Sequence, residues 1–264
     1  MFIGNMVTEA IPARIFALYR IVESKKGISR NELQNLMEPP GIHKESSSYF
    51  STILKAANEL KLVENKDNTI ALIDGNRQLK SIDDFRKYVI SILPDFAEGQ
   101  FWKCSNIIVN MNEKIFEYNA ISDLKMLNYL SEQVGETIKA PMIRGWRFWS
   151  QFLGFGVMND MTFLPNAYVY VKNVINLMGL EKKKEYTMSD FMTRFMQYGL
   201  ILLPSAISNK NLNIAMSSAL RELHDNGEIV LKFGSDQEMK WILYPSRELF
   251  NQPVSSVVYK GVKP

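Results

Sequence analysis

The chain has 264 residues, of which 46% are hydrophobic and 22% are charged. Domains usually contain roughly 100–200 residues, so this length suits one large domain or two to three small ones. The composition is typical of a folded globular protein and excludes collagen-like, disordered and coiled-coil classes. Because 31 Lys and Arg residues stand against 28 Asp and Glu, the formal net charge is only +3. A nucleic-acid partner would therefore need basic residues clustered on one surface.

The residues that enzymes and metal sites require are scarce. Cys104 is the only cysteine, and His43 and His224 are the only histidines, which excludes a disulfide framework and a Cys/His zinc site. No Walker-type glycine loop or HExxH motif is present, and the Gly154-Phe155-Gly156 segment follows a predicted helix instead of a strand. We therefore predict a protein that is not an enzyme and holds no metal or cofactor. A catalytic pair of Cys104 with one of the histidines is an alternative. The apolar neighbours of Cys104 favour a buried, inert thiol.

The location of the protein is predicted from what its segments lack. Residues 1–10 have neither the charged start nor the long apolar run of a signal peptide. The most apolar stretches fall short of the roughly 18 residues needed to span a bilayer. We expect a cytoplasmic protein with no membrane partner.

The first eighty residues contain three helical patterns followed by two short strands. Pro12 begins an apolar repeat that ends at Gly27, and Ser29 with Glu32 gives the capping-box spacing for a short second helix. Residues 46–60 repeat apolar residues at helical spacing. Residues 62–64 and 69–73 then predict strand, turn and strand.

This order of elements resembles a winged helix-turn-helix domain, in which the third helix usually enters the major groove and the hairpin, called the wing, touches the DNA backbone. The resemblance implies that Ser48 and Thr52 on the third helix contact base edges and that Lys44 and Lys55 contact the DNA as well. On the wing it implies contacts from Lys66 and Asn68. The charge departs from the DNA-reading pattern, because residues 12–75 hold nine Lys or Arg against eight Asp or Glu and the third helix has no arginine. The alternative is that this domain docks another protein or acts as a spacer.

A second copy of the same order is predicted between residues 165 and 245. Its helices cover residues 165–178, 190–198 with Ser189 as the cap, and 211–226, and its hairpin joins residues 228–233 to 239–244. The outward candidates on its third helix are Asn213, Ser217, Ser218 and Arg221. Because Asp236 and Glu238 at the wing tip would repel phosphates, docking or dimerisation is weighed equally with DNA contact.

Residues 82–164 show no strong strand alternation and predict a helical connector. The aromatic segment 140–156 has tryptophans and phenylalanines at helical spacing, which favours packing between helices over a stacking platform for unpaired bases. Arg144 and Arg147 in this segment remain candidates for contacting phosphates or an acidic partner. The lysine-rich run 181–185 predicts a solvated connector, with phosphate contact as the alternative. After Pro245, residues 254–259 predict at most one edge strand.

The predicted fold class is mainly α with small β-hairpin wings, that is α+β, with two winged-helix domains joined by a helical connector. The predicted boundaries are 1–80 for the first winged helix, 81–164 for the connector, 165–248 for the second winged helix and 249–264 for a tail.

Four further segments resemble the DpdG-like component of bacterial DNA-modification and phage-defence clusters. They are Ile11-Pro12-Ala13-Arg14, Leu36-Met37-Glu38-Pro39, Trp149 to Gly154 and Phe163-Leu164-Pro165. The resemblance implies an accessory role beside modification or restriction enzymes. We therefore predict a non-catalytic protein that binds DNA, with double-stranded DNA favoured, as such an accessory factor or as a transcriptional regulator. The alternative is a docking subunit of a multi-protein complex, and protein partners or a homodimer stay open.

Overall fold

The first part of the chain forms a helical unit with a small sheet, here called the N-terminal unit (residues 12–72). The computed structural model describes residues 1–264 except 40–47, 75–77, 204–209, 234–239, 247–250 and 262–264. The elements of the unit are α1 (Pro12–Lys25), β1 (Ile28–Ser29), α2 (Arg30–Met37), α3 (Ser48–Glu59), β2 (Val63–Lys66) and β3 (Thr69–Leu72). The antiparallel strands lie in the order β1-β3-β2.

Local sequence signals set the limits of these elements. Pro12 occupies the first turn of α1, which ends where Lys26 and Gly27 adopt left-handed φ angles of 54° and 114°. The hydroxyl of Ser29 accepts a hydrogen bond from the Glu32 backbone N–H at 3.2 Å, which confirms the predicted cap of α2. The β2–β3 turn places Asp67 and Asn68 at φ angles of 48° and 62°, the conformation of a tight type I′ hairpin turn.

The connector contains α4 (Ile82–Ile92), η1 (Leu93–Phe96), α5 (Gln100–Asn110), η2 (Asn112–Glu117), α6 (Leu124–Val134) and α7 (Ala140–Leu153). It also contains the hairpin β4 (Gly156–Asn159) and β5 (Thr162–Pro165), so the prediction of a helical connector without strands is wrong there. Each strand has only four residues, too few for alternation to stand out. Gly156 allows the strands to approach, because a Cβ there would lie 2.5 Å from the carbonyl oxygen of Leu164.

The aromatic segment packs inside the connector. Trp146 and Trp149 of α7 are fully buried. The indole N–H of Trp146 donates to the hydroxyl of Ser105 on α5 at 2.8 Å, and that of Trp149 donates to the carbonyl oxygen of Ala10 at 2.7 Å. The prediction of packing between helices is confirmed for both tryptophans, and α7 also holds the chain that precedes α1.

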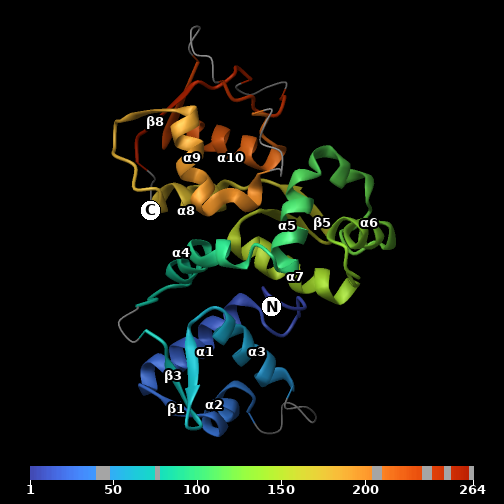
Figure 1. The fold of residues 1–264 in the computed structure, drawn as a ribbon, viewed down its shortest axis with the longest axis vertical. Helices are drawn as coiled ribbons and strands as arrows, with labels where there is room; N and C mark the ends of the chain where they lie inside the picture. Colours follow the sequence, from blue (N-terminus) through green and yellow to red (C-terminus); the bar gives the residue numbers. More distant parts are fainter. Residues whose placement is uncertain (40–47, 75–77, 204–209, 234–239, 247–250, 262–264) are drawn as a thin grey trace.

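The C-terminal unit (residues 168–259) repeats the order of the first. Its elements are α8 (Tyr168–Leu177), β6 (Glu185–Thr187), α9 (Met188–Gly199), η3 (Leu200–Leu202), α10 (Ile214–Asp225), β7 (Ile229–Lys232) and β8 (Ser256–Tyr259). Its strand order, β6-β8-β7, matches β1-β3-β2 of the N-terminal unit. The two units lie at opposite ends of the long axis, with the connector between them (Figure 1).

The strand that completes this second sheet differs from the predicted one. β8 pairs with both β6 and β7 and is buried along its whole length, so residues 256–259 of the predicted segment 254–259 form a central strand instead of an edge strand. Of the predicted partner 239–244, Trp241 and Ile242 form only isolated bridges to Val254 and Asn211. The predicted wing tip with Asp236 and Glu238 lies outside the described residues.

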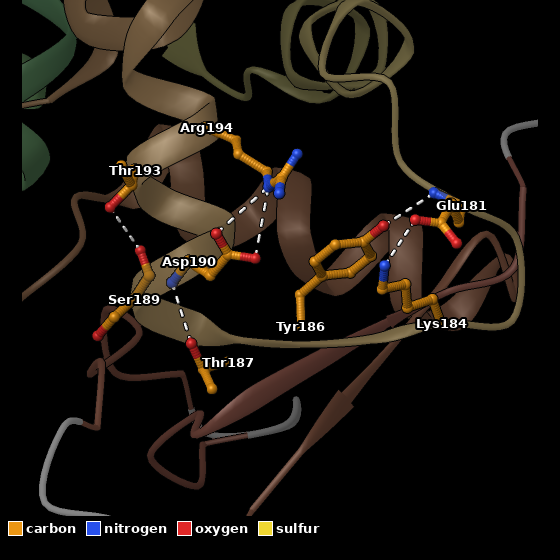
Figure 2. A network of polar contacts seen from close by, with 8 residues as sticks. All are labelled: Glu181, Lys184, Tyr186, Thr187, Ser189, Asp190, Thr193 and Arg194. Atoms are coloured by element: carbon orange, nitrogen blue, oxygen red, sulfur yellow. Dashed lines mark hydrogen bonds and ion pairs between the residues drawn. The ribbon is translucent and has the colours of Figure 1, made fainter.

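The cap of α9 also differs from the prediction. The hydroxyl of Thr187 accepts a hydrogen bond from the Asp190 backbone N–H at 3.1 Å, whereas Ser189 lies in the first turn and its carbonyl oxygen accepts from the Thr193 hydroxyl at 2.8 Å (Figure 2). The reason is that Thr187 ends β6 in an extended conformation and the helix begins directly after it.

These two hydroxyls give a matched test of the start of α9. Replacing a capping Thr by Ala usually costs about 1 kcal/mol, so Thr187→Ala should lower the free energy of unfolding by that amount in urea denaturation followed by circular dichroism. The control Thr193→Ala, on the exposed side of α9, should change it by less than about 0.5 kcal/mol. Unchanged stability in Thr187→Ala would contradict the assignment.

Candidate nucleic-acid interface

The outer face of α3 is the first part of the candidate interface. Phe50, Ile53 and Ala57 bury the inner face of this helix. On the other side Lys55 is exposed and Thr52 is half-buried. Ser48 is the first residue of α3, and its side chain and the whole of Lys44 lie outside the described part of the structure. The structure thus places Lys55 on the surface as expected and Thr52 at its edge.

The acid of α3 is already engaged within the fold. The Glu59 carboxylate accepts a hydrogen bond from the Met1 ammonium at 2.6 Å and another from the Phe2 backbone N–H at 3.1 Å. Burial lowers the pKa of that ammonium, and the interaction with Glu59 opposes the shift. Glu59 therefore points its charge toward the preceding chain, and Lys55 supplies the exposed charge of the helix.

Two arginines from other helices flank the first turn of α3. The guanidinium of Arg14 on α1 lies 4.7 Å from the ring centroid of Tyr49, and that of Arg30 on α2 lies 5.3 Å from the ring centroid of Phe50. The backbone N–H of Arg30 also donates to the carbonyl oxygen of Asn68 in the wing turn at 3.2 Å. Sequence reasoning missed both residues because it searched for arginines on α3 alone, and only the packing of α1 and α2 brings them there.

The wing carries a balanced pair of charges. Lys66 is exposed but forms an ion pair with Glu64 at 2.5 Å. Asn68, at the tip, is exposed as well. An exposed ion pair of this kind contributes little to stability, so Lys66 can exchange Glu64 for another anion at low cost.

The arginines of α7 differ in accessibility. Arg144 is exposed. Arg147 is half-buried, with its guanidinium 4.9 Å from the ring centroid of Phe148 and one nitrogen 3.2 Å from the sulfur of Met161. Arg144 is thus the better placed of the two for contact with an anion.

The candidates on α10 face the interior, so the expectation that they point outward is wrong. Ser217 and Arg221 are buried. The Ser217 hydroxyl accepts from the Tyr244 backbone N–H at 2.8 Å, and Arg221 donates to the Tyr244 carbonyl oxygen at 2.6 Å and to the Asn251 side-chain oxygen at 2.9 Å. Asn213 is also buried and caps α10 by accepting from the Met216 backbone N–H at 2.8 Å. Tyr244 and Asn251, which come later in the chain, are hydrogen-bond partners of Ser217 and Arg221. The Asn213 amide donates to Asn110 and to the Leu202 carbonyl oxygen.

Within α10, all of which the structure describes, only Asp225 at the last position is exposed, whereas Ser218 is half-buried. The helix packs against α8, α5 and β7, and Tyr244 and Asn251 bond to its polar side. Since a helix must present side chains to enter a groove, α10 is closed in this structure, while α3 keeps an outer face.

Cys104 and the two histidines are the residues that the sequence leaves open for nucleophilic chemistry. Cys104 is buried, and burial, with a smaller contribution from the charge of Glu136, raises the pKa of its thiol to about 12. Nδ1 of His224 accepts from the Leu231 backbone N–H at 3.3 Å, and His43 lies outside the described residues. The described part of the chain contains no group of three or more His, Cys, Asp or Glu arranged to hold a metal. None of its helices has the length and apolar character to cross a bilayer.

Comparison with known proteins gives one match. A family model described as DpdG-like matches residues 1–100, a range that contains the whole N-terminal unit, α4 and η1. Searches of the curated proteins and of the solved structures found no match. The match covers two of the four segments that carry the resemblance, residues 11–14 and 36–39, and is consistent with an accessory factor of a DNA-modification system.

The closed state of α10 predicts the effect of removing its arginine. Arg221→Ala should lower the free energy of unfolding by roughly 2–3 kcal/mol, because hydrogen bonds to charged groups contribute about that much and their acceptors would lose a partner. Urea denaturation measures this, with the half-buried Ser218→Ala as a control expected within about 0.5 kcal/mol of the parent. A variant with unchanged stability and weakened DNA binding would instead make Arg221 a surface contact.

Proposed function

We propose that this chain is a non-catalytic, DNA-binding accessory protein of a bacterial DNA-modification or defence system. The observation that carries the proposal is the DpdG-like match over residues 1–100, because it covers the unit that presents an exposed helix face. In this proposal residues 12–72 act as a winged helix that binds double-stranded DNA, with α3 at the major groove and the β2–β3 hairpin along the backbone.

The order of helices and strands, the sheet order β1-β3-β2 and the tight wing turn support the winged-helix part of the proposal. Thr52 and Lys55 lie on the outer side of α3, and Arg30 lies between α3 and the wing turn. Arginine is suited to this place because its planar fork contacts phosphates and guanine edges with two hydrogen bonds. Arg30 supplies the arginine that α3 lacks.

A docking subunit is the second candidate. The closed face of α10 favours it, because it reduces the surface that is free to meet DNA. The C-terminal unit would then bind a protein partner, and the N-terminal unit would serve as a spacer or a second docking surface.

Fluorescence anisotropy with labelled duplex and single-stranded DNA across a salt series tests the first candidate. We expect micromolar or tighter binding to duplex that weakens linearly in log salt, and a slope that falls by about 0.9 for each phosphate contact removed. Lys55→Glu and Arg30→Gln should each weaken binding, whereas Lys125→Glu on α6, an exposed lysine of the connector, should not.

Absence of binding to either DNA at low salt would contradict the DNA-binding proposal for the chain and favour the docking subunit. Equal losses in Lys55→Glu and Lys125→Glu would show an effect of net charge alone and would remove α3 from the interface.

A further inference from the structure

Two segments that are far apart in the sequence meet at one end of the C-terminal sheet. The Lys183 backbone N–H donates to the Tyr259 carbonyl oxygen at 2.6 Å, and the Tyr259 N–H donates to the Lys184 carbonyl oxygen at 3.1 Å. These bonds join the loop between α8 and β6 to the end of β8. Lys182 and Lys183 thereby come next to Lys260, which directly follows β8.

The side chain of Lys182 is held close to this junction. It passes over Gly261, since a Cβ there would lie 2.8 Å from Cε of Lys182 and 3.3 Å from its Nζ. The Lys260 backbone N–H donates to the Glu228 carbonyl oxygen at 2.9 Å, which fixes the chain beside it. Lys182, Lys183 and Lys260 are all exposed, and we call them the lysine cluster.

The carboxylates around the lysine cluster are already matched by other cations. The pairs are Glu181 with Lys184 at 2.5 Å, Glu185 with Lys232 at 2.6 Å and Glu228 with Lys172 at 3.3 Å. Figure 2 shows the first of these pairs beside Tyr186. These pairs raise the pKa of Lys184 and lower that of Glu185, chiefly through the side-chain hydrogen bond in each case. Among the described residues no carboxylate within ion-pair distance balances the three lysines of the cluster.

We propose that the lysine cluster is a second contact surface for the phosphodiester backbone of DNA, separate from α3 and the wing. The inference rests on the proposed DNA binding and adds a site to it. The three lysines lie at one junction of the chain and have no carboxylate within ion-pair distance among the described residues. Their charges therefore add to one positive patch.

The chemistry of the cluster favours backbone contact over base recognition. Lysine ammonium groups are compact charges on flexible stems that bind phosphates without reading sequence. With α10 closed, this loop gives the C-terminal unit a way to hold DNA that does not use its third helix. Two weak sites on one chain strengthen each other because binding at one raises the effective concentration at the other.

The test compares two triple variants of the full chain with equal change in charge. Lys182→Gln/Lys183→Gln/Lys260→Gln removes the lysine cluster. The control, Lys114→Gln/Lys125→Gln/Lys139→Gln, removes three exposed lysines of the connector. Duplex DNA binding is measured by anisotropy from about 50 to about 300 mM salt, a range over which the Debye length shortens roughly 2.5-fold. Circular dichroism melting checks folding.

We expect the cluster variant to bind roughly tenfold more weakly or worse at low salt and its log–log salt slope to fall by about 2 to 3, near 0.9 per phosphate contact. The control should match the parent, and Lys→Arg replacements at the three cluster positions should restore binding. Equal slopes in the parent and the cluster variant, or equal losses in both triple variants, would overturn this inference. If the parent itself binds no DNA, the proposed function fails first. If the parent binds and the cluster variant binds equally well, only the second site fails.

Discussion

The closure of α10 is the constraint on which the account of this protein depends. Ser217 and Arg221 bind the backbone of Tyr244, and Arg221 also binds Asn251, so residues from the end of the chain cover the helix that corresponds in order to α3. Breaking this contact would leave the buried guanidinium of Arg221 without these partners, which costs more than the hydrogen bonds contribute when made. Two units with the same strand order therefore present different surfaces.

This difference assigns different tasks to the two units. The N-terminal unit keeps the outer face of α3, with Lys55 exposed and Arg30 held between that helix and the wing turn. The C-terminal unit carries its unbalanced charge at the end of its sheet, on the lysine cluster. Trp146 and Trp149 pack α7 against α5 and the chain before α1, so the connector is a packed body between the units and not a loose tether.

Sequence patterns predicted the features that depend on neighbours in the chain. The cap at Ser29, the end of α1 at Gly27 and the buried tryptophans of α7 follow from spacing and local propensity, and the structure agrees. The features that depend on distant residues were missed. No local pattern shows that residues 240–246 cover Ser217 and Arg221, that β8 pairs between β6 and β7, or that Arg30 approaches Phe50. The sequence predicted a solvated connector for the lysine-rich run 181–185. Its hydrogen bonds to Tyr259, which bring it next to Lys260, depend on the fold.

Hydrogen–deuterium exchange of the full chain, with and without duplex DNA, tests the central claim most directly, because it locates the contacts of both units in one measurement. The account predicts added protection in residues 49–72 and 180–184, with residues 214–225 and 240–246 unchanged. Added protection confined to residues 214–225 and 240–246, with none in 49–72, would show that α10 opens to meet DNA and would contradict the account.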